Sequence, residues 1–334
     1  MKDSTKYTYA VSRIRAIEKN MIDKNFFDRI IESKTIKNVI GLLEEIEYGN
    51  IHENKSDDFD FEYMLEDESK KLKQLINEVT PGDDFIKTIF HINDYHNAKV
   101  VLKGLSGIEY DDLLIDIGQI SPEELKTIIL EKELSFLPKN LKECIDICLN
   151  NSSILNDPKS IDITMDKAYL EELFESALKT KNTYILNLVK MLIDIYNIKG
   201  WIRIKKRDKN SWDLLNKILV DKGKIDKKTY MNYMEKELDE SLDYFKYTDY
   251  GNLMTQSIEQ FNENGNLTQL EKLCDDYVVN YLKNSKVITF GIEPIISYIM
   301  AKQIEMKNLR IIITGKINNI PNDTIKERLR ECYV

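Results

Sequence analysis

Three short stretches of one pattern decide the fold of this chain: Asp94-Tyr95-His96-Asn97-Ala98-Lys99, Asp194-Ile195-Tyr196-Asn197-Ile198-Lys199 and Glu305-Met306-Lys307-Asn308-Leu309-Arg310. Each reads as an acid, two further residues, an asparagine, an apolar residue and a base. Each also lies within a run of apolar residues at helical spacing. Asparagine is a mediocre helix former because its side chain competes for backbone hydrogen bonds. Its recurrence at one place in three predicted helices indicates one helical unit used three times.

The stretches between these helices follow a common order. Gly118-Gln119-Ile120-Ser121 and Gly223-Lys224-Ile225-Asp226 each precede a predicted helix, and their last residues are suitable N-terminal caps. Gly315-Lys316-Ile317-Asn318 has the same form, and we interpret it as the start of a fourth, partial unit. We expect this half-unit to pack beside the N-terminal helix, predicted over residues 5–31. The predicted domains are helical units over residues 1–115, 116–220 and 221–334, arranged around a pseudo-threefold axis.

Composition favours a helical protein. A chain of 334 residues exceeds one ordinary core. Its 12 Gly and 6 Pro leave few residues for tight turns, which disfavours a β-sandwich or barrel. Apolar periodicity predicts long helices, among them residues 61–79, ending at Pro81-Gly82, and residues 184–206. The predicted fold class is therefore all-α, with three repeated units around a central opening.

Charge and hydropathy argue against nucleic acids and membrane lipids as the main binding partners. The net charge is −9, which argues against nucleic-acid binding and against adhesion to anionic lipid. Residues 1–6 are polar, so we expect no signal peptide. The apolar run Pro294–Ala301 is much shorter than the roughly 20 residues of a membrane span. Four cysteines in this length are typical of a reducing, cytoplasmic environment.

Histidine and cysteine offer little metal chemistry. His91 and His96 would lie on different sides of one helix, so they cannot hold an ion together. Asp94 is three residues from His91, and we expect no more than a hydrogen bond on the helix surface. Cys144 and Cys148 are one helical turn apart without a second pair of ligands, so we expect both in the core.

Acids, nucleophiles and glycine-rich loops give no catalytic signature either. The sequence has no phosphate-binding loop and no Gly-x-Ser-x-Gly elbow. We expect two acidic pairs, Glu44/Glu45 and Glu171/Glu172, to be solvated on polar helix faces. The sequence therefore predicts no catalytic, cofactor-binding or metal-binding residues and no cofactor.

The densest basic stretch, Lys199–Lys209, is the best candidate for a nucleic-acid contact. Trp201 beside Arg203 would stack on a base while the cations meet phosphates. The alternative is a basic helix end that complements its own dipole, or a rim for docking a protein. The acidic chain favours that alternative, and its 18 tyrosines suit protein interfaces.

Several segments resemble the C subunit of the prokaryotic V/A-type rotary ATPases, the counterpart of the d subunit of the eukaryotic vacuolar ATPase. The N-terminal Tyr7–Arg15 is similar to the start of that family. The more specific similarity lies in Gly291-Ile292-Glu293-Pro294-Ile295-Ile296-Ser297-Tyr298, Lys302-Gln303-Ile304-Glu305, Asn308-Leu309-Arg310-Ile311, Gly315-Lys316, Pro321, Glu327-Arg328-Leu329-Arg330 and Tyr333-Val334. The resemblance covers the whole chain.

The resemblance implies a non-catalytic rotor part on the cytosolic face of a membrane. In that family three helical units form a funnel. Its mouth accepts the central shaft of subunits D and F, and its base sits on the membrane ring of lipid-binding rotor subunits. Such a part couples the shaft to proton or sodium transport without entering the membrane. A helical scaffold that binds another protein is the alternative, followed by a nucleic-acid-binding module, and an enzyme is the weakest reading.

Overall fold

The computed structural model describes residues 6–48, 60–105, 107, 113–207, 211–264 and 268–334. Every regular element in these ranges is an α-helix or a short 3-10 helix, which confirms the predicted all-α class. The chain forms two compact bodies, which we describe separately. The middle body is Gly82–Lys236, and the N/C body combines Met1–Pro81 with Glu237–Val334.

The middle body is built on the pairing of α5 with α9. Helix α9 also packs against α7 and α10, and α6 packs against α5. One hydrophobic cluster joins Tyr95 of α5, Leu125 of α6, Cys144 of α7 and Met165 of α9. The elements are α5 (Asp84–Gly104), α6 (Pro122–Glu131), η3 (Leu134–Phe136), α7 (Lys139–Asn150), α8 (Ser152–Leu155), α9 (Pro158–Thr180), α10 (Thr183–Arg207), α11 (Trp212–Ile218) and α12 (Lys227–Asn232).

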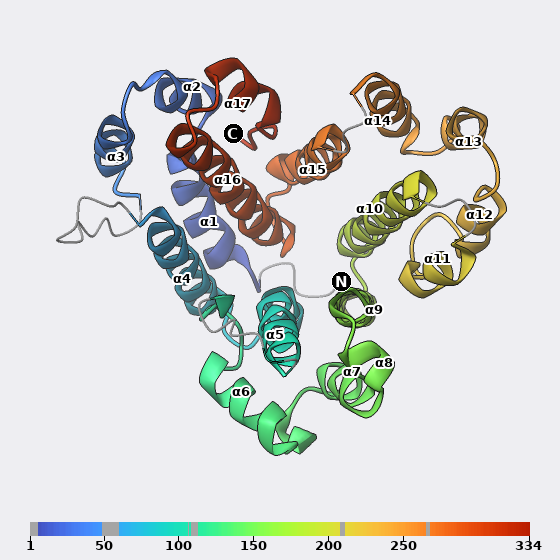
Figure 1. Cartoon of the computed structure of the whole chain (residues 1–334). Coiled ribbons are helices and arrows are strands. Elements are labelled where there is room, and N and C mark those ends of the chain that lie inside the picture. The colour runs from blue at the N-terminus through green and yellow to red at the C-terminus, as the bar shows by residue number, and fades with distance from the viewer. Residues whose placement is uncertain (1–5, 49–59, 106, 108–112, 208–210, 265–267) are drawn as a thin grey trace. The chain divides into compact units, whose positions relative to one another are not determined.

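The N/C body is organised around α16 (Glu293–Ile317), which packs against α1, α2, α3, α4, α15 and α17 (Figure 1). A helix enclosed in this way needs apolar residues around its whole circumference, and α16 has them. The other elements are α1 (Thr8–Ile17), η1 (Glu18–Asn20), α2 (Lys24–Glu32), α3 (Ile36–Glu45), α4 (Phe61–Val79), α13 (Leu238–Phe245), α14 (Gly251–Asn264), α15 (Thr268–Lys283), η4 (Asn284–Val287) and α17 (Asn322–Arg328).

The single N-terminal helix predicted over residues 5–31 is wrong. Helix α1 ends at Ile17, a 3-10 turn follows, and α2 begins only at Lys24. Met21 is extended, with φ −66° and ψ 149°, and the Asp23 carboxylate caps α2 by accepting the N–H of Phe26 at 2.8 Å. The chain therefore leaves the helix at Met21 and starts a new one three residues later, at Lys24.

The interpretation of Gly315-Lys316-Ile317-Asn318 as a helix start is also wrong. Residues 315–317 form the last turn of α16, and the next helix, α17, starts at Asn322. A Cβ atom on Gly315 would lie 2.7 Å from Cδ1 of the buried Ile325, so a larger residue there would force that side chain to shift. The expected packing of this end of the chain on the N-terminal helices is confirmed, since α17 contacts α2.

Candidate functional site

The asparagines of the three stretches all grip the backbone of a later segment. The side-chain amide of Asn97 donates to the carbonyl of Ile115 at 2.8 Å, and its oxygen accepts the N–H of Ile115 at 2.9 Å. Asn197 forms the same two bonds with Val220, at 2.8 and 2.9 Å. We call an asparagine of this kind, with the acid three residues before it, an asparagine clasp.

The third clasp has the same asparagine geometry in the N/C body. Asn308 donates to the carbonyl of Arg330 at 3.1 Å and accepts its N–H at 2.9 Å. Asn97, Asn197 and Asn308 are all 1% exposed or less. Each amide thus satisfies both backbone groups of one residue, and a buried backbone group without a partner costs about 1–3 kcal/mol. These bonds give the three asparagines a structural role.

The acids of the first two clasps bind the backbone just before a helix. Asp94 accepts the N–H groups of Gln119 and Ile120, both at 3.0 Å. Asp194 accepts those of Lys224 and Ile225, at 2.8 and 3.2 Å. These carboxylates therefore anchor the entry to α6 and α12.

Two glycines make room for these carboxylates. A Cβ atom on Gly118 would lie 2.1 Å from Oδ1 of Asp94, and one on Gly223 would lie 2.0 Å from Oδ1 of Asp194. Real Cβ atoms do not approach an oxygen so closely. Glycine is therefore required at both positions by close approach, and the recurring Gly-x-Ile pattern is the sequence signal of that contact.

The acid of the third clasp has a different partner. Oε2 of Glu305 accepts the N–H of Ile22 at 2.7 Å, while Oε1 lies 2.6 Å from the ammonium of Lys302. Lys302 also contacts Glu68 of α4 at 2.8 Å. Burial would lower the pKa of Lys302, but the two carboxylates outweigh it and raise that pKa. Burial raises the pKa of Glu305, and Lys302 opposes the shift.

The expectations for His91 and Glu172 are wrong. His91 does not pair with Asp94; its Nδ1 lies 2.7 Å from Oε1 of Glu172 on α9. Tyr95 donates its hydroxyl to Oε2 of the same carboxylate at 2.6 Å. The Glu172 side chain is 15% exposed rather than solvated, because α9 lies directly against α5. Nothing in the local sequence signals a contact between residues so far apart along the chain.

The remaining candidates are structural. Cys144 and Cys148 lie in the core, as predicted, and burial raises the pKa of Cys148 to about 11. Glu44 and Glu45 are exposed, also as predicted. His96 contacts the carbonyl of Leu113 at 2.9 Å. Within the described ranges, no three His, Cys, Asp or Glu side chains are grouped in a way that would hold a metal ion.

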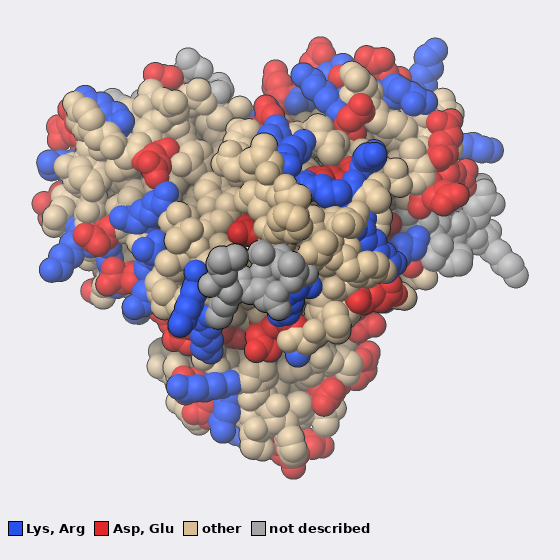
Figure 2. Space-filling view, turned by 180° about the vertical axis from the view of Figure 1, so that it is seen from behind, with Lys and Arg blue, Asp and Glu red and all other residues tan. Residues whose placement is uncertain are grey.

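Trp201, the aromatic residue of the candidate nucleic-acid contact, lies in the protein interior. Trp201 is fully buried, and its ring N–H donates to the carbonyl of Tyr230 at 3.0 Å. Lys205 lies over the indole ring, 4.5 Å from its centroid. Trp201 therefore presents no free ring face for stacking on a base. On the face shown in Figure 2, basic and acidic side chains of the described residues are interspersed. Residues 208 and 209 of the basic stretch lie outside the described ranges.

The buried polar residues described above bind backbone groups of other segments and so hold those segments in place. The protein is therefore an all-helical one in which the asparagine clasps are structural elements. The family described as ATP synthase (C/AC39) subunit matches residues 10–328. The chain belongs to this family, as the resemblance in sequence predicted, and is a C subunit of the V/A type. None of the described helices has the length and apolar character needed to cross a membrane.

Relatives with known names match nearly end to end. The C subunit of the V-type sodium ATPase of Enterococcus hirae is 29% identical over 325 residues, which cover 96% of this chain and 97% of the relative. The C subunit of the A-type ATP synthase of Methanocaldococcus jannaschii is 27% identical, covering 98% of this chain and 87% of the relative. That of Methanosphaera stadtmanae is 26% identical, with 97% and 87% covered.

Proposed function

We propose that this chain is a non-catalytic central-stalk subunit of a V/A-type rotary ATPase or ATP synthase. It joins the rotating shaft of subunits D and F to the membrane rotor ring, on the cytosolic face of the membrane. Torque then passes through it to the ring that moves protons or sodium ions. The observation that carries this proposal is the family match over residues 10–328, supported by relatives that align over at least 87% of their own length.

The chemistry of the clasps supports a mechanical role. Asp94 and Asp194 each accept two backbone N–H groups, and Glu305 is shared between a backbone N–H and an ammonium. Charge-assisted hydrogen bonds of this kind are among the stronger ones in proteins. These acids therefore serve to fix segments rigidly, which is what a coupler that transmits force requires.

The proposal includes three helical units, over residues 1–115, 116–220 and 221–334, around an opening that receives the shaft. Its support is the recurrence of the paired bonds from Asn97, Asn197 and Asn308. Each Asn-bearing helix with its neighbours should superpose on the other two in an experimental structure. Copies that do not superpose would reduce the repeat to a coincidence of composition.

The test is a pull-down with the tagged full chain. We expect it to retain both the D–F shaft and the detergent-solubilised ring, each in the absence of the other. The purified chain should hydrolyse no ATP above the background of a mock purification. Retention of neither partner would overturn the coupling role and favour a scaffold for some other protein. Reproducible ATP turnover by the chain alone would overturn the non-catalytic role.

A further inference from the structure

The first two clasps hold segments that lie a short way along the chain. In each, the residue gripped by the asparagine is followed five positions later by an isoleucine whose N–H binds the acid. The pairs are Ile115 with Ile120 and Val220 with Ile225. A residue at the N-cap position and a helix follow at once, Ser121 with α6 and Asp226 with α12, and of these two side chains only that of Ser121 accepts a capping hydrogen bond.

The third clasp is completed from the other end of the chain. Its acid, Glu305, binds the N–H of Ile22, which lies 283 residues earlier in sequence. Asp23 follows as the cap, and α2 begins at Lys24. The order of acid-bound isoleucine, cap and helix is therefore the same as in the first two clasps. Ile22 is 4% exposed and Ile225 is 5% exposed, so the two isoleucines are buried to the same degree.

We infer that residues 21–32, which comprise the extended Met21, Ile22, Asp23 and α2, form a latch that closes the third clasp from a distant part of the chain. In the other two clasps the equivalent segment is the continuing chain. Here it is an N-terminal segment docked on α16 in its place.

Further contacts hold the latch against α16 and α17. The ammonium of Lys316, at the end of α16, donates to the backbone carbonyls of Ile31 and Ser33. Lys326 of α17 lies 3.7 Å from Asp28. The latch therefore bridges α16 and α17, as expected of a segment that completes a unit.

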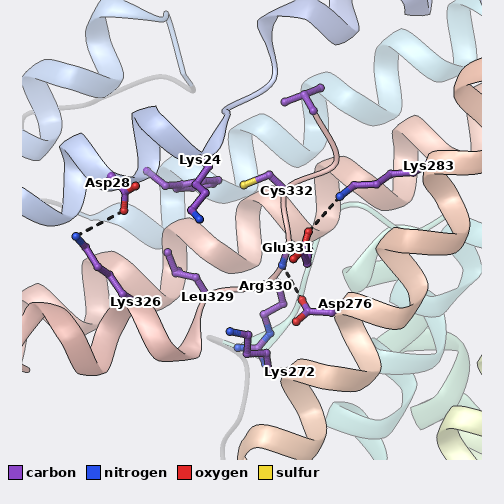
Figure 3. A pocket seen from close by; sticks show the side chains of 12 residues that line it. Lys24, Asp28, Lys272, Asp276, Lys283, Lys326, Leu329, Arg330, Glu331 and Cys332 are labelled. Atoms are coloured by element: carbon purple, nitrogen blue, oxygen red, sulfur yellow. Dashed lines mark hydrogen bonds and ion pairs between the residues drawn. The ribbon is translucent and has the colours of Figure 1, made fainter. Parts of the chain in front are cut away.

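The outer edge of the latch borders a cavity rather than a dry core. The cavity has a volume of about 580 Å³ and lies between α2, α15 and the C-terminal segment (Figure 3). Eight of the 12 residues that line it are charged, among them Lys24 and Asp28 of the latch itself. The inner face of the latch is apolar, and Phe27, Ile30 and Ile31 of α2 are buried. Because local opening usually involves one contiguous unit, we expect residues 21–32 to open together while α4 and the core of α16 stay in place.

Hydrogen exchange on the full-length chain tests this inference. Ile22→Ala removes the buried anchor, and we expect amide exchange in residues 21–32 and in α17 to rise by at least about tenfold. Exchange in α4 and in the middle body should stay unchanged. Glu305→Gln, which keeps the size of the side chain, should give the same pattern and serves if the first variant does not fold.

Ile225→Ala is the matched control because its side chain is equally buried at the second clasp. It should raise exchange in α12 and leave residues 21–32 as they are. The inference is overturned if Ile22→Ala leaves the exchange of residues 21–32 unchanged, or if the whole N/C body loosens together. It is also overturned if Ile225→Ala has no effect on α12, since the two isoleucines would then not be equivalent.

Discussion

At the scale of single residues, the fold depends on buried polar side chains whose partners are backbone atoms. Asn197 binds both backbone groups of Val220, and Asp194 binds the N–H groups of Lys224 and Ile225. A helix-spaced apolar pattern alone would allow many arrangements of these segments. The clasps select one arrangement, because any other leaves buried polar groups without partners.

Gly223→Ala tests how closely a carboxylate and a backbone approach each other. A Cβ atom would lie 2.0 Å from Oδ1 of Asp194, so the carboxylate must move and lose its hydrogen bonds. We expect the free energy of unfolding to fall by about 2–4 kcal/mol. Urea unfolding followed by circular dichroism measures it.

Gly41→Ala is the control for that substitution. Gly41 lies within α3, and a Cβ atom there would meet nothing within 4 Å. Alanine should therefore stabilise the helix by about 0.5–1 kcal/mol. Equal effects of the two substitutions would show that the contact between Gly223 and Asp194 is not tight.

At the scale of elements, the sequence predicts helices well and their long-range contacts poorly. Helix α4 spans Phe61–Val79, as apolar periodicity and Pro81-Gly82 predict. The break between α1 and α2 escapes prediction because Met21-Ile22-Asp23 fits a helical pattern. The chain leaves the helix there because Glu305 takes the N–H of Ile22, and no local signal announces a partner so distant in sequence.

The sequence predicts that the three asparagines of the candidate site recur at equivalent positions. It does not predict which backbone groups they bind. The acid-x-x-Asn pattern and the Gly-x-Ile pattern are both visible in the sequence, but only the structure shows that one binds the other. The third Gly-x-Ile, at Gly315, misleads because it matches the pattern inside α16. The segment that binds the acid of the third clasp is instead Met21-Ile22, which has the isoleucine but not the glycine.

The pairing of α5 with α9 should depend on pH through Glu172. Burial raises the pKa of this carboxyl, but hydrogen bonds from His91 and Tyr95 outweigh it and lower the pKa. A lowered pKa in the folded state means that the carboxylate contributes stability above its ordinary unfolded pKa. That contribution is lost as pH falls through the folded value.

Glu172→Gln should therefore be less stable than the unsubstituted chain at pH 7, and the difference should shrink as the solution is acidified below pH of about 4.5. Urea unfolding at a series of pH values measures the difference. Glu44→Gln, at an exposed position on α3, is the control and should change stability little at any pH. A difference for Glu172→Gln that stays constant with pH would contradict the assigned role of its charge.

At the scale of the whole molecule, the chain is a C subunit whose buried charges and amides are engaged in its own architecture. Asp94, Asp194, Lys302 and Glu305 are all buried, and each binds a backbone group or a neighbouring ion. A fold fixed in this way suits the transmission of force between partners. The proposed coupling function depends on that rigidity and on contacts with the shaft and the ring.

The most direct measurement is ATP-driven ion transport by the rotary complex reconstituted in vesicles with and without this chain, with ATP hydrolysis followed in parallel. We predict that omitting the chain leaves ATP hydrolysis by the catalytic head but abolishes ion transport. Adding back the chain, or its Gly41→Ala variant, should restore transport. Transport that persists without the chain would contradict the account.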